Sequence, residues 1–135
     1  MSRSEYSDDI DNWQLIRWRG QVASSVRGAR GQLLLKDLLV SLDAMPEKKL
    51  IAHELEKDGC HCALGAVGVA KGLPIQEIDP EDLDVVAKTF NISNALAREI
   101  VFINDEGGFY DETPEKRWSR VRAWVAANIA AQVKS

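Results

Sequence analysis

Residues 60–72 read CHCALGAVGVAKG, and this stretch decides how the rest of the chain is arranged. After the two cysteines nearly every side chain is small or slim, and glycine recurs at Gly65, Gly68 and Gly72. The pattern predicts a short helix that Gly72 closes, with Lys71 near its negative end. Gly65 and Gly68 cost helix propensity, so we expect them to allow close approach of another helix. We therefore predict that this is the central helix of the domain.

Cys60, His61 and Cys62 at the start of this stretch raise the question of a metal or redox site. A structural zinc site usually has four ligands, in pairs roughly two to four residues apart, and a redox pair has about two intervening residues. Here one residue separates the cysteines, no second pair exists, and His53 lies upstream. His61 is poorly placed to act as a base for either neighbouring thiol. We interpret both cysteines as small packing residues and predict no metal and no cofactor.

Two helices are expected before this stretch. The first begins after a cap at Asp11 and has Gly20 in its middle, which weakens it. The glycines of RGARGQ, residues 27–32, predict a break or kink, and Pro46 ends the second helix. The apolar face expected on the first helix consists of Trp13, Ile16, Val22, Ala23 and Val26. The apolar residues of the second helix follow helical spacing and are Leu34, Leu35, Leu38, Leu42 and Met45.

The following segments are less uniform. Residues 47–59 fit either a helical turn or a short extended piece. Asp79 predicts a helix cap, with Pro80 at the first helical position, acids in the first turn and Asn91 as a left-handed terminator. Ser93 predicts the cap of the next helix.

Thr113 and Pro114 predict the start of the last helix. No segment shows the alternation of a strand, so we predict an all-α fold, a compact bundle of about six short helices around the small-residue central helix. One domain is expected over 12–135, after a disordered tail at 1–11. The apolar stripe of the last helix is Trp118, Val121, Val125, Ile129 and Val133.

Composition fits an ordinary globular domain. The 135 residues are 45% hydrophobic and 28% charged, and no run approaches the ~18 apolar residues of a membrane span. The N-terminal segment lacks the apolar core of a secretory signal, and two closely spaced cysteines make a poor disulfide framework. We therefore expect a reduced, cytoplasmic protein without membrane association.

Charge is distributed unevenly, although the net charge is only −4. Residues 13–36 hold five basic and no acidic residues, 77–84 hold five acids and no base, and 116–135 hold five bases and no acid. This balance argues against a general nucleic-acid binder but allows a local basic face. That face would serve an acidic partner or nucleic acid, or else be solvated and paired with the 77–84 acids. The candidate partner-binding residues are Arg17, Arg19, Arg27 and Arg30, which cannot all share one helix face.

A second candidate surface is a helix-turn-helix over residues 80–91 and 93–103. The recognition helix would expose Ser93, Asn94 and Arg98. One arginine is little for reading bases, and the acids just before the unit would face phosphates with the wrong sign. Two ordinary helices are the alternative interpretation.

The sequence NDEGGFYDE at 104–112 groups several acids without the ligand spacing of a calcium loop. We expect Asn104 and Asp105 to cap the local backbone, and Gly107 and Gly108 to adopt positive φ. Carboxylates arranged for hydrolysis are the alternative, for which no third group can be named.

Three motifs in this order resemble a family. CALGAVGVAKGL, VFINDEGG and ETPEKRWSRVRAWV are similar to a group of uncharacterised small proteins of bacteriophages, prophages and bacterial genomes. RGARGQLLLKDLLVSLDAMPEKKLIAHEL resembles the N-terminal part of its phage-type members, so the resemblance covers residues 18–129. It implies a phage or prophage origin and no catalytic residue.

Together these observations predict a non-catalytic accessory protein that binds a host or phage protein, with nucleic acid as a less favoured partner. A helix-turn-helix regulator is the second interpretation and a small hydrolase the third. An exposed N-terminal basic face would favour the first, and an exposed helix from Ser93 the second. A pocket lined by Asp105, Glu106 and His61 would favour the third.

Overall fold

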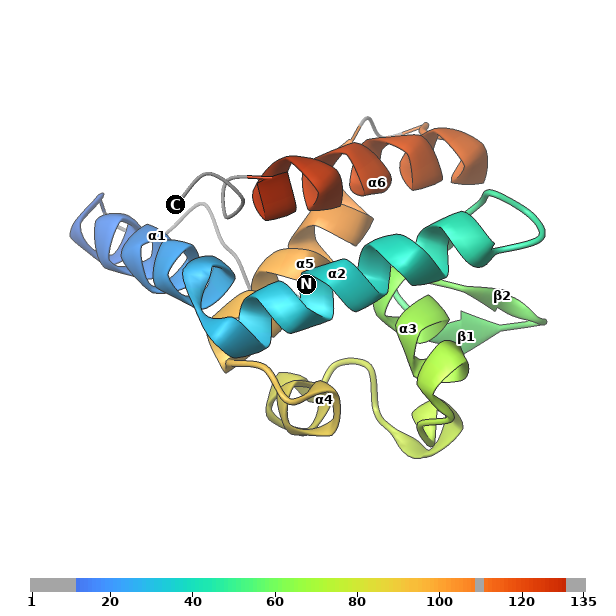
Figure 1. Ribbon diagram of the computed structural model, residues 1–135, viewed down its shortest axis with the longest axis horizontal. Helices are drawn as coiled ribbons and strands as arrows, with labels where there is room; N and C mark the ends of the chain where they lie inside the picture. Colours follow the sequence, from blue (N-terminus) through green and yellow to red (C-terminus); the bar gives the residue numbers. More distant parts are fainter. Residues whose placement is uncertain (1–11, 109–110, 131–135) are drawn as a thin grey trace.

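The computed structural model describes residues 12–108 and 111–130, which form a compact helical bundle with one small hairpin (Figure 1). This confirms the predicted fold class. The predicted tail at 1–11 and the predicted stripe residue Val133 lie outside the described residues. In chain order the elements are α1 (Asn12–Arg27), α2 (Ala29–Ala44), β1 (Glu56–Lys57), β2 (Cys60–His61), α3 (Ala63–Lys71), the 3-10 helix η1 (Ile75–Glu77), α4 (Leu83–Phe90), α5 (Asn94–Glu106) and α6 (Pro114–Ala130).

Two helices organise the core. In Figure 1, α6 lies along α2, and α5 passes behind α2, where it packs against α1, α3, α4 and α6. The four leucines predicted from their spacing on α2 are all buried, which confirms the inward face of that helix. They are Leu34, Leu35, Leu38 and Leu42.

Helix α3 is buried along its first six residues, as its small side chains predict. The expected close approach of another helix holds for one of its two inner glycines. A Cβ on Gly68 would overlap the Ile75 side chain of η1 and would touch Phe90 of α4. A Cβ on Gly65 would instead overlap the carbonyl oxygen of Leu55, in the bends before β1. Gly65 therefore packs against irregular backbone and Gly68 against helical neighbours.

Several predicted helix ends are confirmed. Gly72 ends α3 with φ 70°, and Asn91 ends α4 with φ 59°. The hydroxyl of Ser93 accepts the Leu96 N–H at 3.0 Å, and that of Thr113 accepts the Lys116 N–H at 3.1 Å.

The predicted start of α4 at Asp79 and Pro80 is wrong. Asp79 accepts the Glu81 N–H two residues ahead, which closes a turn and not a helix. The helix begins at Leu83, because Asp82 accepts the Val85 N–H three residues ahead. Two acids therefore compete for one cap, and the second one starts the helix.

The segment before the hairpin and the start of α3 are held by Asn104 near the end of α5. Its side chain is buried, accepts the Ala63 N–H at 3.0 Å and donates to the Ile51 carbonyl at 2.9 Å. The same amide group donates to Asp105, which in turn accepts the His53 N–H. Asn104 and Asp105 therefore bind backbone far along the chain, where a local cap was expected.

Candidate partner-binding surface

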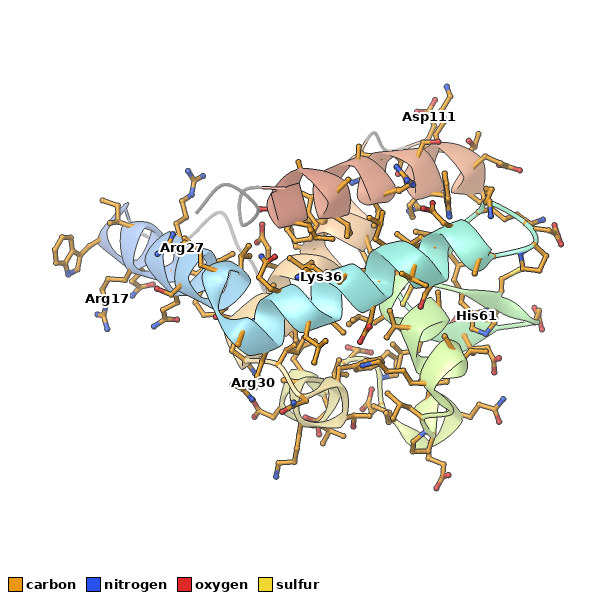
Figure 2. All side chains as sticks on the ribbon, in the orientation of Figure 1. Arg17, Arg27, Arg30, Lys36, His61 and Asp111 are labelled. Carbon is orange, nitrogen blue, oxygen red and sulfur yellow. The ribbon has the colours of Figure 1, made fainter. Side chains whose placement is uncertain are left out.

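The four candidate arginines near the N-terminus are all exposed. Arg30 donates to the Asn91 side chain at 3.3 Å, which holds it against the end of α4. Within residues 12–108 and 111–130, Arg17, Arg19 and Arg27 have neither an ion-pair nor a hydrogen-bond partner. Figure 2 shows Arg17 and Arg27 extending from α1 into solvent. The alternative that these bases pair with the 77–84 acids has no counterpart among the described ion pairs.

The predicted apolar face of α1 is wrong at its N-terminal end. Val26 is buried and Val22 is partly buried, but Trp13 is 68% exposed and Ile16 is 62% exposed. At about 100° per residue, Trp13 and Val22 lie about 180° apart around the helix, so they cannot share a face. An exposed tryptophan and isoleucine therefore stand beside unpaired arginines.

We call this surface the α1 outward face, made of Trp13, Ile16, Arg17, Gly20, Ser24 and Arg27. Arg17 and Arg27 are about 80° apart around the axis, whereas Arg17 and Arg19 are about 160° apart. Two of the four candidate arginines therefore belong to this face. Arg19 lies at its edge, and Arg30 belongs to α2.

A groove of about 630 Å³ runs along one side of this face, between α1 and the beginning of α5. It brings together Arg17 and Ser93, residues that the sequence assigned to two different functions. Small side chains make up most of its floor, and Gly20 and Ser24 were not singled out as site residues from the sequence. The lining is Arg17, Gly20, Gln21, Ser24, Ser25, Ser93 and Ala95.

The three residues proposed to read DNA are partly buried, and each contacts another side chain of the protein. Ser93 caps α5 and donates to the Ser25 hydroxyl at 2.7 Å. Asn94 donates to the Asp84 carboxylate. The guanidinium of Arg98 lies 4.7 Å from the ring centre of Trp18 in α1, within cation–π range.

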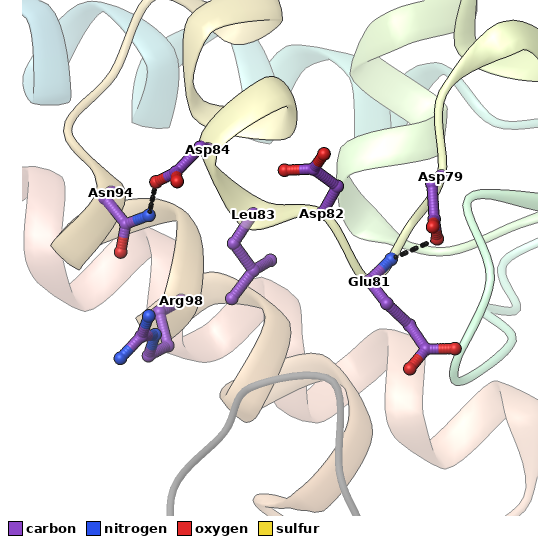
Figure 3. A pocket seen from close by; sticks show the side chains of 7 residues that line it. All are labelled: Asp79, Glu81, Asp82, Leu83, Asp84, Asn94 and Arg98. Atoms are coloured by element: carbon purple, nitrogen blue, oxygen red, sulfur yellow. Dashed lines mark hydrogen bonds between the residues drawn. The ribbon is translucent and has the colours of Figure 1, made fainter.

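Asn94 and Arg98 also line a second pocket, of about 390 Å³, among four carboxylates (Figure 3). Asp79 and Asp82 use an oxygen each to cap backbone, and Asp84 binds Asn94. Such a surface repels phosphate. Among the described residues, no three His, Cys, Asp or Glu side chains are grouped as a metal site requires.

The cysteines take different positions. Cys62 is buried, and its sulfur accepts the Gly65 N–H at 3.4 Å as the cap of α3, which extends its predicted packing role. Cys60 is half-buried at an apolar pocket of about 420 Å³. The His61 ring lies 3.0 Å from Glu56, which also accepts from Gln76.

Two of the acids at 104–112 have structural roles, Asp105 as described above and Glu112. Glu112 binds Arg120 through both carboxylate oxygens, and this hydrogen-bonded guanidinium holds the pKa of Glu112 below its usual value. The expected positive φ at Gly107 is wrong, because its φ is −77°, and Gly108 does not adopt it either. Both glycines lie against the Glu112–Arg120 pair, since a Cβ on Gly107 would meet the Arg120 side chain and a Cβ on Gly108 would meet both side chains, so a larger residue would displace the pair.

Comparison of the chain with protein-family models, curated proteins and solved structures finds no match. No helix within the described ranges has the length and apolar character needed to cross a membrane.

Proposed function

We propose that this protein is a non-catalytic binding module, which holds a protein partner on the α1 outward face. The observation that carries the proposal is the set of unpaired arginines beside exposed Trp13 and Ile16. Tryptophan and arginine dominate the binding energy of protein interfaces, because they combine large contact area with polar anchoring. The resemblance to phage and prophage proteins adds the proposal of an accessory protein that acts on a host or phage protein.

Charge supports an acidic partner. The protein is acidic overall, so an uncompensated basic helix creates a local field of opposite sign. Complementary charge speeds association and orients the partner. Salt should therefore weaken binding, because screening shortens to roughly 8 Å at physiological ionic strength.

A DNA-binding regulator is the second proposal. Its support is the pairing of α4 and α5 through a short turn, with Asn91 in the left-handed conformation. Against it, the first turn of α5 is engaged with α1, and its flank is acidic. The protein partner is therefore the better supported of the two.

Arg17→Ala combined with Arg27→Ala tests the proposal. The pair should keep the wild-type melting temperature, since neither side chain has a partner to lose, and should lose most capture of a specific protein from host lysate. Lys88→Ala with Lys116→Ala is the matched control, because it removes two exposed charges from α4 and α6. Full capture by the arginine double variant contradicts the proposal. Binding of duplex DNA that requires Ser93 and Arg98 would favour the regulator.

A further inference from the structure

Gly20 is a glycine that the fold does not require. It lies within α1 in ordinary helical conformation, and a Cβ built there meets nothing within 4 Å. By contrast, a Cβ on Gly31 would overlap the Ser25 carbonyl, so packing explains that glycine. Glycine inside a helix lowers helix stability relative to alanine. Glycine at position 20 therefore lowers the stability of α1, and no neighbouring group in the part of the protein that the structure describes occupies the space that it leaves open.

The surroundings of Gly20 form a surface on which a second helix fits. Ser24 lies one turn further along the same face, and Ser25, Ser93 and Ala95 continue the floor of the groove. Small side chains on a helix face let another backbone approach closely. Beyond one end of this floor Trp13 offers exposed apolar area, whereas Ile16 lies about 180° from Ser25 around α1 and so faces away from the groove.

The charge of the groove selects an acidic occupant. Arg17 stands in its lining without an ion-pair partner among the described residues. Arg27 lies on the same outward face of α1 and is likewise without an ion-pair partner among the described residues. An acidic occupant therefore meets uncompensated positive charge along α1.

We infer that the groove between α1 and α5 receives an acidic amphipathic helix of the partner protein. Small side chains of the partner would cross at Gly20 and Ser24, acids would meet Arg17, and apolar residues would cover Trp13. The inference rests on the proposed function and names the partner's chemistry at the same surface.

Other occupants fit less well. A second copy of the chain would bring α1 against α1, and the unpaired arginines would then repel one another. Nucleic acid needs several cations along a backbone, whereas Arg17 is the single cationic side chain among the seven residues that line the groove. Both occupants remain as outcomes of the test.

The probe is a display library of helix-forming peptides, about 18 residues or five turns long, with randomised outward positions. Selection against the wild-type protein should enrich acidic peptides with small residues at the crossing position. Their affinity should fall about tenfold or more for Gly20→Leu, because the leucine fills the space where the backbones meet. Gly20→Ala should raise the melting temperature by about 3–5 °C and still weaken binding, a combination that a purely structural glycine does not produce.

Ala123→Leu is the matched control, since it places an exposed leucine on α6, outside the groove. It should leave peptide affinity unchanged. A selection that enriches no acidic helix, or enriched peptides that bind Gly20→Leu as tightly as the wild type, overturns the inference. So does a dimer in sedimentation that Gly20→Leu abolishes, or competition by single-stranded or duplex DNA at the same groove.

The two proposals fail separately. If the partner's capture is lost with Arg17→Ala and Arg27→Ala but persists with Gly20→Leu, the α1 outward face still binds a protein and the helix-in-groove geometry is wrong. If capture persists in both variants, the proposed function itself is wrong.

Discussion

Helices α1 and α6 are nearly the same length, and each carries three arginines and two tryptophans. Their arginines nevertheless have opposite environments. Arg120 binds Glu112 and the Ile103 carbonyl, and Arg122 binds Asp43 of α2. The corresponding side chains of α1 have no such partners within the described residues.

The difference lies in what surrounds each helix. Helix α6 packs against the end of α5. The last carbonyls of α5 have no N–H donor within their own helix, so arginines of α6 donate hydrogen bonds to them. Arg117 donates to the Asn104 carbonyl at 3.0 Å and to that of Leu50 at 3.3 Å. Trp118 donates to the Leu42 carbonyl. The arginines of α6 therefore stabilise the fold, because carbonyl and carboxylate oxygens lie within their reach. The arginines of α1 have no such acceptors in the described part of the chain and stay available for binding a partner.

The largest effect on stability is expected for Arg120→Met, which tests the comparison of the two helices. The variant leaves Glu112, whose side chain is only 7% exposed, without its main partner and costs about 3 kcal/mol of unfolding free energy. Chemical denaturation measures the loss. Arg19→Met on α1 is the matched control and should change stability little. Equal losses for the two variants would remove the distinction between the helices.

A second test compares glycines. Gly65→Ala should lower the unfolding free energy by about 1–3 kcal/mol, because the added Cβ collides with backbone that cannot turn aside. Gly20→Ala, on the open face of α1, should have the opposite sign. Thermal melts of both variants measure this, and a stabilised Gly65→Ala would show that the segment at Leu55 yields easily.

The smallest expected effect is a change in the unfolding free energy with pH. Hydrogen bonds from Arg120 lower the pKa of Glu112 below 4.5. A carboxyl with a depressed folded-state pKa stabilises the fold above its unfolded pKa, and this contribution is lost as pH falls through the folded value. The wild type should therefore be more stable than Glu112→Gln at pH 7, and the difference should shrink below about pH 4.

Urea denaturation at several pH values measures that difference. Arg17→Ala on α1 should follow the wild-type pH profile, since Arg17 has no carboxylate partner among the described residues. A gap between the wild type and Glu112→Gln that stays constant down to pH 3 would mean that packing, and not the ion pair, explains it.

Features with a local cause could be predicted from the sequence. The leucine spacing of α2 and the ends at Gly72, Asn91, Ser93 and Thr113 each depend on residues within one or two helical turns. The hairpin could not be predicted, because strands of two residues show no periodicity. The start of α4 was wrong because Asp79 and Asp82 carry equivalent local signals.

The candidate site was predicted in part. The arginines stand out by their charge, and counting residues around the helix axis could have shown that Trp13 faces away from Val22 and Val26. It could not have shown this for Ile16, which lies about 80° from Val26. No local signal shows which basic helix finds acceptors, because Arg122 and Asp43 are 79 residues apart in sequence. The position of Ser93 in the groove could not be predicted for the same reason, because it depends on a hydrogen bond to Ser25, which is 68 residues away in the sequence.

The pairing of α2 with α6 also bears on the order of folding. The Trp118 side chain donates a hydrogen bond to the Leu42 carbonyl, and the Leu50 N–H donates one to the Pro114 carbonyl. Both hydrogen bonds join residues that are more than 60 positions apart in the sequence. During synthesis, α2 leaves the ribosome seconds before α6 does. Its leucine face then lacks one of its covers, and closing so long a loop slows the final step. While α6 is still missing, the uncovered part of this face is apolar surface of the kind that makes incomplete chains prone to aggregation.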